Sequence, residues 1–140
     1  MNLLEVKNIS KTYGTGEATV HALKQATFSV PKGEFVAIVG ESGSGKSTLL
    51  NMIGGMDIPD EGEITVDGVS LRGLKEKELA VFRRSKVGFI YQNFNLIPTL
   101  TVRENIEVGA YLSDKPLDVD ELLHTLGHRQ SHDQSELGSR

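Results

Sequence analysis

Apolar residues along the chain gather in short runs whose spacing predicts strands. Residues 3–10 alternate imperfectly between apolar and polar positions, which predicts a half-exposed strand. Residues 20–23 and 26–30 predict a second strand region. Two continuous apolar runs, residues 35–39 and 87–91, predict buried parallel strands. The chain therefore reads as an α/β protein that begins with antiparallel strands.

Helices and turns are predicted from helix-forming residues and from the glycines, prolines and capping residues around them. The segments 47–53, 74–84, 102–112 and 118–126 predict helices. Gly54 and Gly55 end the first of these, and Thr101 with Glu104 forms a capping box before the third. Residues 11–16 predict a loop, and residues 31–34 and 57–62 predict turns. Asp67-Gly68 is a strong hairpin signal after a short strand at 63–66.

One segment carries a specific chemical signal, the phosphate-binding pattern G-x-x-x-x-G-K-[ST]. It comprises Gly40, Glu41, Ser42, Gly43, Ser44, Gly45, Lys46 and Ser47. It lies between an expected strand and an expected helix, as the motif requires, which disfavours an incidental glycine-rich turn. Glycines allow backbone N–H groups to converge on phosphate oxygens, and a helix N-terminus favours an anion. We expect this loop and the adjoining Thr48 to bind ATP, with Lys46 on the β- and γ-phosphates and Ser47 on Mg²⁺.

Composition narrows the range of partners. The 140 residues have a formal net charge of -4 and a sequence pI near 5.5, so no general basic surface for nucleic acid is expected. The absence of cysteine excludes disulfides and thiolate metal sites. No apolar run approaches the ~18 residues of a membrane span, and residues 1–7 lack the apolar stretch of a signal peptide. A membrane role would therefore require a partner.

The order of these features resembles the ATP-binding subunit of an ABC transporter. The pattern of residues 4–13, Ala22-Leu23, residues 33–40 and the segment 88–106 carries the resemblance, which covers about residues 2–130. Residues 14–23 and 54–62 are most similar to the macrolide-export and lipoprotein-release branch. The resemblance implies an α/β P-loop NTPase of the ABC ATPase type with an N-terminal antiparallel portion. Residues 1–140 would then form one partial nucleotide-binding domain.

The family resemblance also implies roles for two residues outside the loop. Tyr13 would stack on adenine, although sequence pattern alone favours a loop aromatic packed on the sheet. Gln92 would contact Mg²⁺ and the attacking water. The implied partners are a transmembrane permease subunit and a second ATP-binding subunit. The implied location is cytoplasmic and peripheral, at the inner face of the cell membrane.

The sequence departs from the family's pattern near its end. Residues 135–137 resemble the approach to the signature motif, but Gly138-Ser139-Arg140 follows. We find no signature motif, no second acidic strand and no switch histidine, so the C-terminal half of the domain is expected to be missing, and no catalytic residue is identified. Residues 64–67 resemble an apolar strand ending in an acid and could substitute for the missing acidic strand, but a hairpin explains them better.

Two further patterns are explained by ordinary surface roles. The spacing of His124, His128 and His132 could suggest a metal face, but exposed polar residues explain it better. The basic run 83–86 could meet lipid headgroups or a partner, although a solvated helix end is the simpler interpretation. The alternatives to a transporter ATPase are a nucleotide-binding or docking module without turnover, and a P-loop kinase or GTPase. The last is disfavoured because no guanine-reading N-K-x-D is present.

Overall fold

The computed structural model describes residues 1–127, which form two compact units, Met1–Gly88 and a second that begins at Phe89. The elements of the first unit are β1 (Asn2–Tyr13), η1 (Gly16–Ala18), β2 (Val20–Pro31), α1 (Lys46–Ile53), β3 (Glu61–Val66), β4 (Val69–Ser70) and α2 (Glu76–Lys86). The second unit contains α3 (Val102–Tyr111) and α4 (Val119–Thr125). No helix within residues 1–127 is long and apolar enough to cross a membrane.

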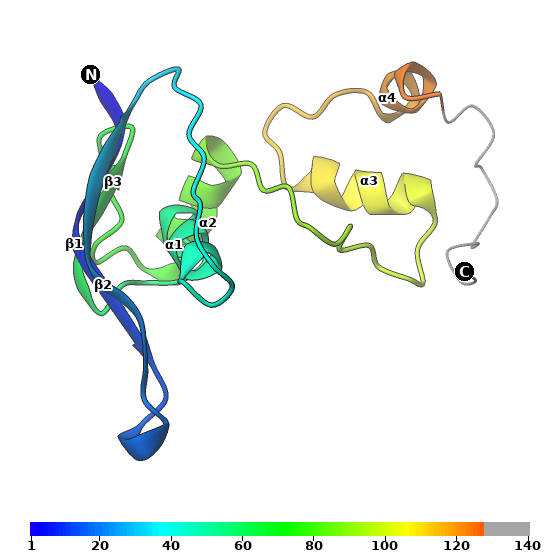
Figure 1. Ribbon diagram of the computed structural model, residues 1–140. Coiled ribbons are helices and arrows are strands. Elements are labelled where there is room, and N and C mark those ends of the chain that lie inside the picture. The colour runs from blue at the N-terminus through cyan, green and yellow to red at the C-terminus, as the bar shows by residue number, and fades with distance from the viewer. Residues whose placement is uncertain (128–140) are drawn as a thin grey trace. The chain divides into compact units, whose positions relative to one another are not determined.

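The first unit is an antiparallel sheet with two helices on one of its faces (Figure 1). The strand order is β2-β1-β3-β4, so β1 pairs on both sides. The register places Val6 opposite Phe28 on β2 and opposite Ile64 on β3. Asp67-Gly68 makes the predicted turn between β3 and β4, and both residues adopt positive φ, as a tight hairpin requires.

A single apolar core joins this sheet to the helices. On β3 the buried side chains alternate, as a strand's period of two requires, and on β1 a register shift between Val6 and Ile9 leaves both residues buried. The fully buried members are Val6, Ile9, Met52 and Ile64, and Leu49, Val66, Leu71 and Phe82 complete the cluster. α1 is therefore fixed to the sheet by its apolar side, which holds its N-terminus in place.

β1 extends further than the sequence indicates. The predicted loop at residues 11–16 is wrong for its first half, since β1 continues to Tyr13 and pairs Thr12 with His21 and Tyr13 with Val20. The cross-strand contact between Thr12 Oγ1 and His21 Nδ1, at 3.2 Å, accompanies this pairing. The consequence is that Tyr13 is a strand residue, directed by the sheet rather than by a loop.

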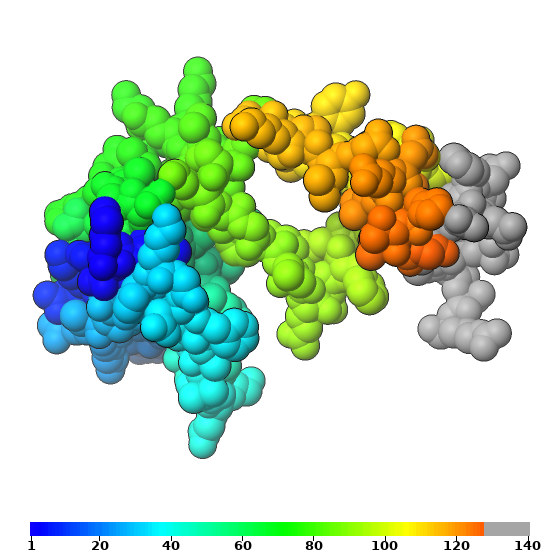
Figure 2. Space-filling view, turned by 90° about the horizontal axis from the view of Figure 1, so that it is seen from above, coloured from blue at the N-terminus to red at the C-terminus, as the bar shows by residue number. Residues whose placement is uncertain are grey.

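The two predicted parallel strands are not formed. Residues 35–39 and 87–91 have no regular secondary structure, and Phe35 and Ile90 are fully exposed at 96% and 102%. The segment 35–39, cyan in Figure 2, lies at the surface of the first unit, where Phe35, Val36 and Val39 are exposed and Ile38 packs against the core. A strand requires ladder partners on its edges, and within residues 1–127 no strand lies beside either segment.

In the second unit the helices begin at the capping residues that the sequence offers. Thr101 caps α3, accepting a bond from Glu104 N, and the Glu104 carboxylate bonds back to Thr101 N at 2.7 Å. Asp118 caps α4 in the same way through Glu121 N at 2.9 Å, and Gly127 follows the helix at φ +79°. An ion pair between Arg103 and Asp120 joins the two helices. His128 and His132 lie outside the described residues.

Candidate functional site

The phosphate-binding loop runs from Gly40 into the first turn of α1. α1 begins at Lys46, and its N-cap Gly45 has a left-handed backbone with φ 89°. Because Gly45 has no side chain, no side-chain oxygen caps the helix, and the first turn carries no acidic residue. α3 and α4, in contrast, are capped by Thr101 and Asp118. The first-turn N–H groups of α1 are thus left without a side-chain acceptor, which suits an external anion.

The absence of a side chain at Gly45 has a steric basis. A Cβ atom built on Gly45 would lie 2.4 Å from the carbonyl oxygen of Ala22 and 3.1 Å from Leu23 Cδ2. Both contacts are on β2, which passes close to the loop. Only glycine allows the loop to approach β2 this closely while also adopting positive φ.

The Lys46 ammonium lies across the mouth of the loop. Its Nζ donates to Gly40 O at 2.7 Å, to Glu41 O at 2.5 Å and to Ser44 Oγ at 3.1 Å. A phosphate at the loop would have to exchange some of these neutral acceptors for its own charged oxygens, and charge-assisted bonds are the stronger ones. The cation is therefore held where an anion would meet it.

An open hollow of about 620 Å³ lies in front of the loop. Its lining comes from the end of β1, from β2, and from the loop with the start of α1: Tyr13, Val20, Ala22, Ser42, Gly43, Gly45, Lys46, Ser47 and Thr48. The structure thus brings the sequence-predicted Tyr13 together with most of the predicted loop. Gly40, Glu41 and Ser44 do not line the hollow, and they supply the acceptors for Lys46 just described.

Tyr13 is held by Asp57, a residue of the predicted turn at 57–62. The Tyr13 hydroxyl donates to Asp57 Oδ2 at 2.5 Å, and the Lys11 Nζ lies over the ring, 5.3 Å from its centroid. The hydrogen bond to Asp57 is the main cause that raises the pKa of Tyr13, with burial and the Asp57 charge adding to it. The two residues are 44 positions apart, so no short-range signal could have linked them.

The residues predicted to hold a metal are not brought together in this way. Ser47 lines the hollow, whereas Gln92 is an exposed residue of the second unit, and its contact with the loop stays a prediction. Within residues 1–127 no group of three or more histidine and carboxylate side chains could hold a metal ion.

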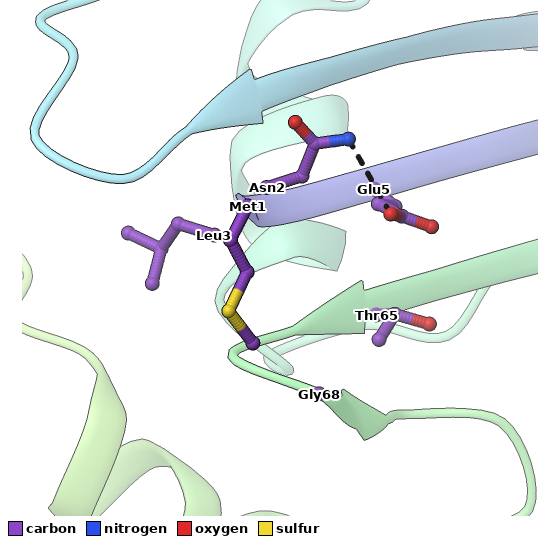
Figure 3. Close-up of a pocket in the computed structure, with 6 residues that line it drawn as sticks. All are labelled: Met1, Asn2, Leu3, Glu5, Thr65 and Gly68. Atoms are coloured by element: carbon purple, nitrogen blue, oxygen red, sulfur yellow. Dashed lines mark hydrogen bonds between the residues drawn. The ribbon is translucent and has the colours of Figure 1, made fainter.

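A second hollow lies at the start of β1 and has a different character. It is lined by Met1, Asn2, Leu3, Glu5, Thr65 and Gly68. Figure 3 shows the Met1 side chain extending towards the turn between β3 and β4, and Asn2 donating to Glu5 Oε1 at 3.4 Å. Its one charged side chain is the Glu5 carboxylate, and no lysine or arginine side chain lines it. The hollow beside Tyr13 is the better candidate for a nucleotide.

Comparison with known proteins shows which family this chain resembles. The family model described as ABC transporter matches residues 23–138. The chain is 49% identical over 124 residues to the ABC transporter ATP-binding protein YxdL of Bacillus subtilis (strain 168), covering 88% of this chain and 48% of YxdL. It is 43% identical over 132 residues to the macrolide export ATP-binding/permease protein MacB of Neisseria meningitidis (strain Z2491), covering 91% of this chain and 20% of MacB.

A solved structure is similar as well. The dimeric post-hydrolysis state of the ATP-binding cassette MJ0796, bound to ADP and Pi, aligns with a TM-score of 0.75 at 44% identity, covering 84% of this chain and 51% of that one. These are P-loop ATPase cassettes. The chain belongs to the ABC transporter family, which confirms the predicted resemblance and fold class. It spans about half the length of YxdL and of the MJ0796 chain.

Proposed function

We propose that this chain binds Mg-ATP in the hollow between Tyr13 and the phosphate-binding loop. The observation that carries the proposal is the convergence of three separate elements on that hollow: the end of β1, β2, and the loop with the start of α1. A flat aromatic at one side and a cation with helix N–H groups at the other match a nucleotide, whose base is flat and whose phosphates are anionic.

The described residues divide the ligand between them. The backbone N–H groups of residues 43–47 and the Lys46 ammonium would receive the phosphates, and Tyr13 would take the base. The Ser47 hydroxyl would ligate Mg²⁺, with Gln92 as the proposed second protein contact. Mg²⁺, when bound, neutralises phosphate charge. The close approach of Gly45 to β2 supports the fit, because a side chain there would collide with Ala22 O and displace the loop.

The wider role follows from the family. We propose that the complete protein couples ATP to export or lipoprotein release by a membrane permease subunit, and that it pairs with a second ATP-binding subunit. MacB is described as an ATP-binding/permease protein, and the MJ0796 cassette is dimeric with ADP and Pi. Both support this assignment. The protein would then act at the cytoplasmic face of the membrane, held there by its partner.

Calorimetric titration of the 140-residue chain with Mg-ATP tests the binding site. Lys46→Ala removes a charge-assisted contact, which typically contributes about 1.5–3 kcal/mol, so ATP affinity should fall by roughly tenfold to a hundredfold. Lys24→Ala is the matched control, because Lys24 is an exposed β2 lysine that does not line the hollow. Equal ATP affinity in the parent chain and Lys46→Ala would overturn the proposal.

A further inference from the structure

A polar cluster joins the end of β1 to the loop that follows α1. The Lys11 Nζ lies 3.0 Å from Asp57 Oδ1 and 3.5 Å from Asp60 Oδ1, and it donates to Ile58 O at 2.7 Å. Asp57 Oδ2 accepts the Tyr13 hydroxyl. All of these groups belong to the first unit, beside the proposed nucleotide hollow.

This cluster is more than a set of solvated surface charges. The Lys11 side chain is only 13% exposed and that of Asp57 31%. Burial acts against the charge of Lys11, but the hydrogen bond to Asp57 and the charges of Asp57 and Asp60 outweigh it and raise the pKa of Lys11. Burial likewise acts against the Asp57 charge, while its bonds to Tyr13, Lys11 and Ile58 N lower the pKa of Asp57. Both groups are therefore charged at neutral pH and fixed in place.

The cluster leaves Tyr13 little freedom. The hydroxyl is anchored by Asp57, and one face of the ring is covered by the Lys11 ammonium 5.3 Å from its centroid. A tyrosine without such an anchor could turn about two side-chain torsions at 42% exposure, and ordering it on binding would cost conformational entropy. The remaining ring face is the one available to a flat ligand.

We propose that Asp57, supported by Lys11, is a positioning residue that holds the Tyr13 ring so that the nucleotide base stacks on the face opposite Lys11. This inference rests on the proposed ATP binding and adds a determinant of base affinity. It predicts that Asp57 acts on the base through Tyr13 and leaves the phosphate end of the site unaffected.

Asp60→Ala is a matched control that tests whether Asp57 only fastens the loop to β1. Its Oδ2 accepts Thr12 N at 2.7 Å and its Oδ1 pairs with Lys11, so it also ties the loop to β1. No contact joins Asp60 to Tyr13 among the hydrogen bonds of the described residues. If Asp57 only fastened the loop, Asp57→Ala and Asp60→Ala would affect binding alike.

The experiment compares ATP with inorganic tripolyphosphate, which has no base, on the 140-residue chain. Asp57→Ala should weaken ATP roughly threefold to tenfold, the range of one lost hydrogen bond, and tripolyphosphate by less than about twofold. Tyr13→Phe, which keeps the ring but not the hydroxyl, should reproduce the loss for ATP. Asp57→Ala should add no further loss of ATP affinity in a Tyr13→Ala background, and Asp60→Ala should not discriminate between the ligands.

Several results would overturn the inference. The first is an Asp57→Ala loss of affinity that is equal for ATP and tripolyphosphate. The second is a loss of ATP affinity from Asp57→Ala that persists in the Tyr13→Ala background, and the third is unchanged ATP affinity in Tyr13→Phe. The last measurement decides the question if Asp57→Ala does not fold. A parent chain that binds neither ligand overturns the proposed function and this inference together. A parent chain that binds ATP while Asp57→Ala binds it equally well overturns the inference alone.

Discussion

Replacing Gly45 by alanine tests how closely the phosphate-binding loop approaches β2. The new Cβ would be placed at φ +89° and 2.4 Å from Ala22 O, a distance at which atoms must move. The left-handed backbone costs an L-residue about 1–2 kcal/mol. Displacing a backbone carbonyl adds roughly 1–3 kcal/mol, the range seen for overpacked sites. We therefore expect Gly45→Ala to lower the free energy of unfolding by about 2–5 kcal/mol.

Gly43→Ala separates the two contributions. Gly43 has a similar positive φ, +80°, but nothing lies within 4 Å of its added Cβ. It should therefore lose only the backbone contribution, about 1–2 kcal/mol. The difference between the two variants measures the contacts with β2, at Ala22 and Leu23.

Urea titration followed by circular dichroism, without nucleotide and at low temperature, gives both free energies of unfolding. The Gly45 variant should also bind ATP more weakly, because Gly45 O accepts the Leu49 N–H at 2.9 Å and a displaced Gly45 would move the start of α1. Equal destabilisation by the two substitutions would refute the argument, as would a neutral Gly45→Ala.

Three further predictions follow from the same site. Tyr13→Ala should weaken ATP by roughly 1–3 kcal/mol while leaving tripolyphosphate binding nearly unchanged; calorimetry with both ligands checks this, and parallel losses would assign Tyr13 to the fold alone. Bonds to Tyr13 and Lys11 hold the pKa of Asp57 below its ordinary 3.8, so the Asp57 charge stabilises the fold above that pH, and this contribution is lost as pH falls through the lowered folded-state pKa. The difference in unfolding free energy between the parent chain and Asp57→Asn should disappear over this acid range, and a difference that grows there would contradict the assignment. The 140-residue chain should release no phosphate from ATP at a useful rate, because its sequence offers no identifiable acid for the metal or the base, and it should unfold or self-associate easily, because Phe35, Val36 and Val39 are exposed. Steady phosphate release that Lys46→Ala abolishes would contradict the first expectation, and a cooperative monomeric unfolding transition well above room temperature would contradict the second.

Elements with local causes were predictable from sequence. The turn at Asp67-Gly68 and the Thr101 capping box each depend on residues within a few positions, and both are confirmed. α1 was predicted for the same reason, since its start and stop are marked by glycines. The phosphate-binding loop belongs to this class, and this is why its position at the head of α1 was foreseeable.

Features that depend on distant pairing were not predictable. Residues 35–39 are apolar enough for a buried strand, but composition cannot supply the hydrogen-bonding neighbours that make a strand. β1 was extended past its predicted end by its pairing with Val20 on β2. The contact between Tyr13 and Asp57 spans 44 positions and appears only when the sheet and α1 are packed together. For that reason the sequence did not predict that Asp57 contacts Tyr13.

The placement of Tyr13 also gives the molecule a built-in optical reporter. The chain has no tryptophan and three tyrosines, and Tyr13 is the tyrosine of the first unit, while Tyr91 and Tyr111 belong to the second. Ultraviolet absorption and emission therefore arise from phenol rings, one of which lines the nucleotide hollow. Subtracting the spectrum of Tyr13→Phe from that of the parent chain isolates the signal of a single ring. Changes at the hollow can thus be followed in solution without attaching a dye.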